Sequence, residues 1–125
     1  MKKMVAFAMM LLVLTGCKGE KTMNYEQITP EQAKEIMDTQ KDYVIIDART
    51  EEEFAQGHIE SAILIPEYEV IDRAEDEIPD KDTLVLVYCR SGRRSKIAAE
   101  ALAKLGYTNV KEFGGIIDWE YKIVK

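Results

Sequence analysis

The sequence of 125 residues lacks a long apolar run, an excess of positive charge, internal repeats and low-complexity tracts. Its N-terminal apolar stretch, from Met4 to Leu14, is too short for a comfortable membrane span, and no later segment is a candidate. The 17 basic and 23 acidic residues give a net charge of −6, which does not favour nucleic acid as a partner. The remaining composition, 46% hydrophobic and 32% charged, is that of one folded domain.

Residues 1–16 have the pattern of a secretory signal peptide, with two lysines, an apolar run and then small residues. The ending "LTGC" resembles the bacterial lipobox, after which the cysteine is lipidated and becomes the new N-terminus. This resemblance implies that Cys17 anchors an exported protein to a membrane, because a multiply acylated cysteine is a stable anchor. An ordinary signal peptide with an unrelated cysteine is the alternative. Residues 17–23 would then be lipidated cysteine and tether, and residues 24–125 the domain.

Helix starts are well marked in the folded part. Thr29 and Gln32 have the spacing of a capping box, as do Thr50 and Glu53, so helices are expected from about residues 30 and 51. Helical spacing of apolar residues also marks residues 67–78 and the segment from Arg93 or Arg94 to residue 105.

Compact apolar runs predict strands at residues 42–48, 61–66, 83–88 and 109–113. The run "TLVLVY" is continuous, which is typical of a strand buried on both faces of a parallel sheet. After the last strand, Gly114 and Gly115 are expected to turn the chain into a final helix or an extended tail. Strands that alternate with helices predict an α/β fold with a parallel, helix-covered sheet.

The scarce positive charge gathers around one thiol, in "CRSGRRS", directly after the clearest strand. Ligands of parallel α/β sheets bind beyond the carboxyl ends of the strands, where Cys89 is expected to lie. Backbone N–H groups of the loop can point at one spot there, with Gly92 free to take a positive φ, and the next helix adds the positive end of its dipole. These groups favour a thiolate at Cys89 and would also hold an anionic substrate.

Three motifs, in order, resemble those of rhodanese-like domains. "VIIDARTEEEFAQGHIESAILIP" resembles the first characteristic region of that family, "VYCRSGRRS" its active-site loop and "GGIIDW" its closing motif. The resemblance covers nearly all of residues 24–125. It implies a three-layer α/β fold, in which helices flank a five-stranded parallel sheet.

The resemblance also implies sulfur transfer. Cys89 would take a sulfane sulfur from a small anionic donor such as thiosulfate, a persulfide or a polysulfide, and pass it from a persulfide to a thiol or cyanide. No metal or organic cofactor is needed, and a redox or sulfur-carrier protein is a possible partner. The residues expected to bind the donor are Arg90, Ser91, Gly92, Arg93 and Arg94. Of these, Arg90 and Arg93 are expected to meet its negative charge with their side chains.

Two other functions stay open. Relatives that act on phosphate or arsenate have a loop one residue longer, with an arginine six positions after the cysteine, where this chain has Ser95. The other alternative is a non-catalytic module that binds an anion or a protein, with Cys89 incidental or a redox sensor. Arg94 has a second interpretation as a solvated residue of the first helical turn, and Ser95 as a helix cap rather than a donor to the site.

The remaining polar candidates are expected to be structural. His58 is the only histidine, and thiolate chemistry in a positive cradle needs no base. Asp47, at a strand end, is expected to pair with a nearby arginine and to support the site at most indirectly. Trp119 is expected in the core behind the glycines of the closing motif.

Overall fold

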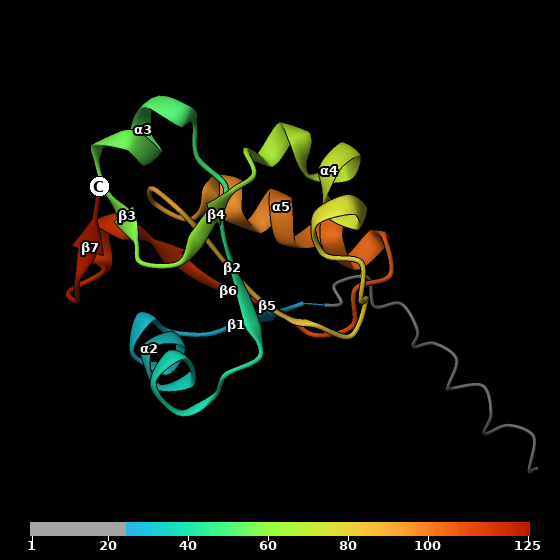
Figure 1. The fold of residues 1–125 in the computed structure, drawn as a ribbon, viewed down its shortest axis with the longest axis horizontal. Coiled ribbons are helices and arrows are strands. Elements are labelled where there is room, and N and C mark those ends of the chain that lie inside the picture. The colour runs from blue at the N-terminus through green and yellow to red at the C-terminus, as the bar shows by residue number, and fades with distance from the viewer. Residues whose placement is uncertain (1–24) are drawn as a thin grey trace, which may run out of the picture.

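The structure is a computed structural model that describes residues 25–125. Its main sheet has five strands in the order β1-β6-β5-β2-β4, and every neighbouring pair is parallel (Figure 1). The predicted five-stranded parallel sheet is therefore confirmed. The strands in chain order are β1 (Glu26–Gln27), β2 (Tyr43–Asp47), β4 (Ala62–Leu64), β5 (Leu84–Cys89) and β6 (Val110–Gly115).

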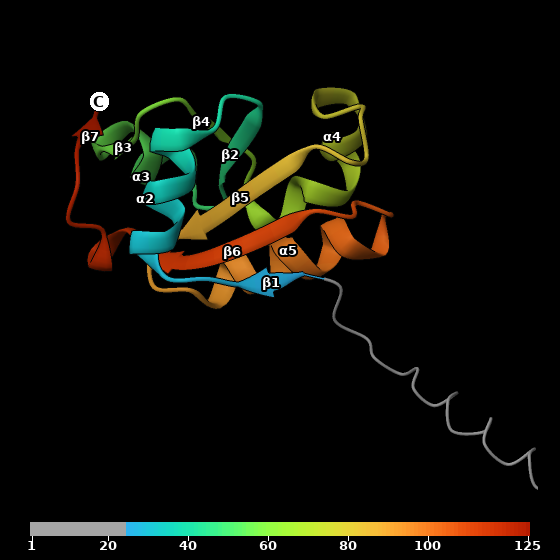
Figure 2. The ribbon, with the colours of Figure 1, turned by 90° about the horizontal axis from the view of Figure 1, so that it is seen from below.

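Helices cover both faces of this sheet. Helix α2 (Pro30–Thr39) lies on one face, while α4 (Val70–Glu77) and α5 (Arg93–Lys104) lie on the other (Figures 1 and 2). The central strand β5 is fully buried, and its alternate residues pack into two different apolar clusters, one with each set of helices. This alternation confirms the three-layer α/β fold and explains why "LVLVYC" is apolar throughout.

Both predicted capping boxes are present. The Thr29 hydroxyl accepts the Gln32 N–H at 3.0 Å at the start of α2. The Thr50 hydroxyl accepts the Glu53 N–H at 3.2 Å at the start of α3 (Glu51–Gln56), and Gly57 ends that helix. The segment predicted as helical at residues 67–78 is the 3₁₀ turn η1 (Glu67–Glu69) followed by α4. Local sequence therefore determines where these helices begin.

The C-terminal part differs from the expectation. Gly114 and Gly115 do not turn the chain but complete β6, because both continue the strand that lies beside β5. A 3₁₀ turn η2 (Ile116–Asp118) follows, and then β7 (Ile123–Val124) pairs antiparallel with β3 (His58–Ile59). These strands and β1 have two residues each, which is too short for a period of two to be visible in the sequence.

The expected signal peptide and the lipidated Cys17 lie outside the described residues, so both stay predictions. Within residues 25–125, no helix is long and apolar enough to cross a membrane.

Candidate functional site

Cys89 is the last residue of β5 and lies at the carboxyl edge of the sheet. The residue is 1% exposed, and its Sγ accepts the Gly92 N–H at 3.0 Å. Gly92 has a φ of +117° and is the N-cap of α5, so the predicted positive φ is confirmed. The next three N–H groups belong to the first helical turn, where no intrahelical acceptor exists. The sulfur thus lies under the N-terminus of α5.

Strand β6 supports the loop from behind. Cys89 lies opposite Gly115, after a register shift between β5 and β6. A Cβ built on Gly115 would lie 1.9 Å from the carbonyl oxygen of Arg90 and 2.5 Å from the Cα of Ser91. The Ile117 N–H donates to the same Arg90 oxygen at 3.2 Å. The second glycine of the closing motif, Gly115, is therefore required sterically, because any side chain there would collide with the loop that packs against this strand.

A buried carboxylate that the sequence analysis did not identify lies beside the sulfur. Ser95 Oγ is 3.4 Å from Cys89 Sγ, and it donates to Glu112 Oε2 at 2.5 Å. Ser95 is the third residue of α5 rather than its cap, and both Ser95 and Glu112 are buried. The sequence did contain a signal, because Glu112 is two residues after Val110 and must share its face of β6, toward α5.

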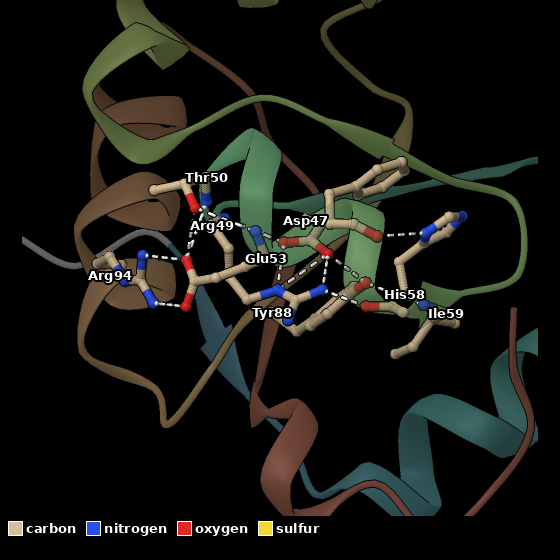
Figure 3. Close-up of polar contacts among 10 residues, drawn as sticks. Asp47, Arg49, Thr50, Glu53, His58, Ile59, Tyr88 and Arg94 are labelled. Carbon is tan, nitrogen blue, oxygen red and sulfur yellow. Dashed lines mark hydrogen bonds and ion pairs between the residues drawn. The ribbon is translucent and has the colours of Figure 1, made fainter. Parts of the chain in front are cut away.

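The arginines of the loop differ in their surroundings. The side chains of Arg90 and Arg93 are exposed, and within residues 25–125 neither forms an ion pair. The Arg94 guanidinium makes two parallel bonds to the Glu53 carboxylate, at 2.9 and 3.0 Å (Figure 3). This ion pair connects the start of α5 to the start of α3. Arg94 is thus neither simply solvated nor free, and its contact with a substrate stays a prediction.

Glu53→Gln should weaken this connection in a pH-dependent way. Hydrogen bonds from Arg94 lower the pKa of Glu53 from 4.5 to about 2, so the charged pair stabilises the fold above about pH 4.5 and is lost as the pH falls through about 2. Because the pair is partly exposed, the expected loss in the free energy of unfolding is about 1 kcal/mol at neutral pH. Urea unfolding of the variant and the wild type between about pH 2 and neutral pH measures this difference in the free energy of unfolding. The control is Glu52→Gln, and a difference that stays constant down to about pH 2 would contradict the prediction.

A second polar cluster lies under α3 (Figure 3). The Arg49 guanidinium donates to both carboxylate oxygens of Asp47 and to the Gly57 carbonyl at 2.7 Å. The Tyr88 hydroxyl donates to Asp47 at 2.6 Å and accepts the Ile59 N–H at 3.0 Å. Burial, followed by the charge of Asp47, raises the pKa of Tyr88. Asp47 thus pairs with an arginine as expected, and its connection to the loop runs through Tyr88, which precedes Cys89.

Tyr88→Phe should destabilise the fold by about 2 kcal/mol, because it removes one of the hydrogen bonds to the buried Asp47 carboxylate and leaves the Ile59 N–H without the hydroxyl that accepts it. Thermal or urea unfolding measures the change. Tyr68→Phe is the matched control, since Tyr68 is 68% exposed and should show no effect. Equal stability of the two variants would mean that the cluster does not support the sheet.

His58 and Trp119 make structural contacts. The His58 ring stacks on Phe54 at 3.7 Å, and its Nδ1 lies 2.9 Å from the Phe54 carbonyl oxygen. Trp119 is half-buried and packs against Phe113, with ring centroids 5.6 Å apart. Within residues 25–125, no three acidic, cysteine or histidine side chains are grouped so that they could hold a metal ion.

Comparison with known proteins agrees with this geometry. The rhodanese-like domain family matches residues 29–122. The chain is 45% identical over 73 residues to the thiosulfate sulfurtransferase PspE of Escherichia coli, which is 58% of this chain and 70% of that protein. It is 39% identical over 94 residues to a sulfurtransferase of Allochromatium vinosum, across 74% of this chain and 86% of the relative. The solved structure of a rhodanese with anions from E. coli matches with a TM-score of 0.63 and 42% identity, over 66% of this chain and 98% of that chain.

A parallel sheet that places a thiol under a loop rich in arginine defines, with these relatives, a sulfurtransferase. The chain belongs to the rhodanese-like domain family, and it is a rhodanese-type sulfurtransferase.

Proposed function

We propose that the protein moves a sulfane sulfur from thiosulfate, a persulfide or a polysulfide to a thiol or cyanide, through a persulfide on Cys89. The observation that carries this proposal is the position of Sγ, 3.0 Å from the Gly92 N–H at the start of α5. In the first step the thiolate attacks the outer sulfur of the donor, and for thiosulfate the S–S bond breaks with sulfite as leaving group. In the second step the acceptor takes that sulfur and Cys89 returns to its starting state.

The loop would stabilise the negative charge that the sulfur carries as it attacks and in the persulfide. The N–H groups of the first turn of α5 and the helix dipole favour an anion at Sγ and at the outer sulfur of a persulfide. The exposed Arg90 and Arg93 are the cations that we assign to the arriving donor, since their charges are not paired within the described part of the chain. Ser91, Gly92 and Arg94 contribute backbone to the same cradle.

The size of the site favours sulfur over phosphate or arsenate. Counted from Cys89 to Arg94, and so into the first turn of α5, the loop has six residues, the length that the resemblance to sulfur-transferring relatives implies. The position where the phosphate-specific relatives carry an arginine is Ser95, a short neutral side chain buried at the sulfur. No guanidinium can reach a phosphate from there.

We also propose that the protein is exported and attached to a membrane by lipid on Cys17. This proposal rests on the sequence of residues 1–17. Metabolic labelling with a fatty acid would label the wild type but not Cys17→Ser, and labelling of both would exclude lipidation at this cysteine.

Sulfite release tests the sulfur-transfer proposal. When purified protein is mixed with thiosulfate and no acceptor, we expect one sulfite per protein in a single burst, and thiocyanate only after cyanide is added. A protein that releases no sulfite with thiosulfate and takes no sulfur from polysulfide or glutathione persulfide would instead be a non-catalytic module, and the proposal would be wrong.

A further inference from the structure

Glu112 is a buried carboxylate that lines the same hollow as Lys96 without forming an ion pair in the described part of the chain. It lies on β6 with 2% of its surface exposed, and within residues 25–125 it forms no ion pair. Its Oε2 accepts the Gly114 N–H at 3.0 Å and the Ser95 hydroxyl at 2.5 Å, and its Oε1 is 3.4 Å from the Gln27 amide. A buried charge without an ion pair is costly, so its retention beside a reactive thiol calls for a reason.

The hydroxyl of Ser95 connects this carboxylate to the sulfur. Three acceptors surround Ser95 Oγ: Glu112 Oε2 at 2.5 Å, the Gly92 carbonyl at 3.0 Å and the Gly114 carbonyl at 3.3 Å. A hydroxyl has one proton to donate, and the charged and nearest acceptor takes it. The lone pairs of Oγ are then free to accept the S–H of Cys89, at 3.4 Å. Sulfur, hydroxyl and carboxylate thus form one continuous hydrogen-bonded chain.

We propose that Glu112 receives, through Ser95, the proton that Cys89 loses when its sulfur reacts. The S–H bond breaks, Ser95 takes that proton and passes its own to Glu112 Oε2, and the electron pair left on sulfur attacks the donor. The charge of the site stays at one negative unit, on the carboxylate at rest and on the sulfur in the persulfide state. Two negative charges so close together in a buried site would be strongly unfavourable. When the acceptor removes the outer sulfur, the proton returns to Cys89 by the same route.

Glu112 acts through Ser95, so it is a positioning residue for the sulfur chemistry, and this inference rests on the proposed function. The charged and titratable groups around Glu112 belong to β5, α2, α5, the residue before β1 and the segment after β6. They are Tyr25, Glu31, Cys89, Lys96, Asp118 and Glu120.

Glu112→Gln tests the proposal, because the amide can still accept the Ser95 and Gly114 hydrogen bonds but cannot take the proton. We expect persulfide formation with thiosulfate to be about a hundredfold slower at neutral pH, with the deficit shrinking as the pH rises and water removes the thiol proton. Glu112→Asp, which keeps a carboxylate, should recover part of the rate. A structural role would predict a loss that does not depend on pH. Glu26→Gln, on β1, is the control and should react at the wild-type rate.

Infrared difference spectroscopy gives a direct readout. Addition of thiosulfate to the wild type should produce the carbonyl band of a protonated carboxyl group, and the band should be missing in Glu112→Gln. Mass spectrometry of the same samples reports the persulfide. A persulfide without the band, or a Glu112→Gln variant that reacts as fast as the wild type at neutral pH, overturns the role of Glu112 and leaves the proposed function intact. A wild type that forms no persulfide overturns both.

Discussion

Cys89→Ser should reduce sulfur transfer from thiosulfate to cyanide by at least about a thousandfold, to the background rate. A serine hydroxyl can accept the Gly92 N–H in place of Sγ, so the loop should keep its shape. It cannot form a persulfide, however, and residues 25–125 contain no other cysteine that could carry the sulfur. Thiocyanate formation and circular dichroism together measure activity and folding.

Cys17→Ser is the matched control for this variant, because it removes the other cysteine of the sequence and leaves the loop unchanged. Its rate of thiocyanate formation should equal that of the wild type. If the two variants lost activity equally, or if Cys89→Ser kept it, the sulfur would not pass through Cys89.

Gly115→Ala should nearly abolish sulfur transfer, because the added methyl group would displace the loop that holds Cys89. Its φ of −131° and ψ of 155° suit any residue, so the effect is purely steric. The added Cβ would lie 1.9 Å from the Arg90 oxygen and 2.4 Å from the Arg90 carbonyl carbon. The loop would have to move by about 1 Å, which is enough to cost about a hundredfold in rate. The strain should also reduce the free energy of unfolding by about 1–3 kcal/mol.

Gly106→Ala separates the two effects of that substitution. Gly106 follows α5 with a φ of +103°, and the nearest atom to its added Cβ would be Lys81 Nζ at 3.7 Å. Backbone strain should destabilise this variant by about 1 kcal/mol while its rate stays normal. Normal sulfur transfer by Gly115→Ala would show that the loop does not depend on the strand behind it.

The elements that the sequence predicted are those with local causes. The capping boxes at Thr29 and Thr50 use residues three positions apart, and the buried strand β5 shows as an unbroken apolar run. The position of Cys89 follows from these elements, because a loop between a buried strand and a helix start must lie at the carboxyl edge of the sheet.

The features that the sequence did not predict depend on contacts between distant residues. Arg94 pairs with Glu53, 41 positions earlier. From its neighbours in the sequence alone, Arg94 was predicted either to bind the substrate or to face solvent. Ser95 and Glu112 are 17 positions apart and meet only because β6 lies beside β5. Two-residue strands such as β1 and β7 are defined by their partners rather than by their own pattern.

The central claim is that the sulfur passes through Cys89, and mass spectrometry of this residue tests it most directly. Purified protein is exposed in parallel to thiosulfate, polysulfide and glutathione persulfide. We predict that the peptide containing Cys89 gains one sulfur atom with at least one donor, and that cyanide removes it. An unchanged Cys89 with all three donors, in a sample whose thiol is shown to be reduced, would contradict the account.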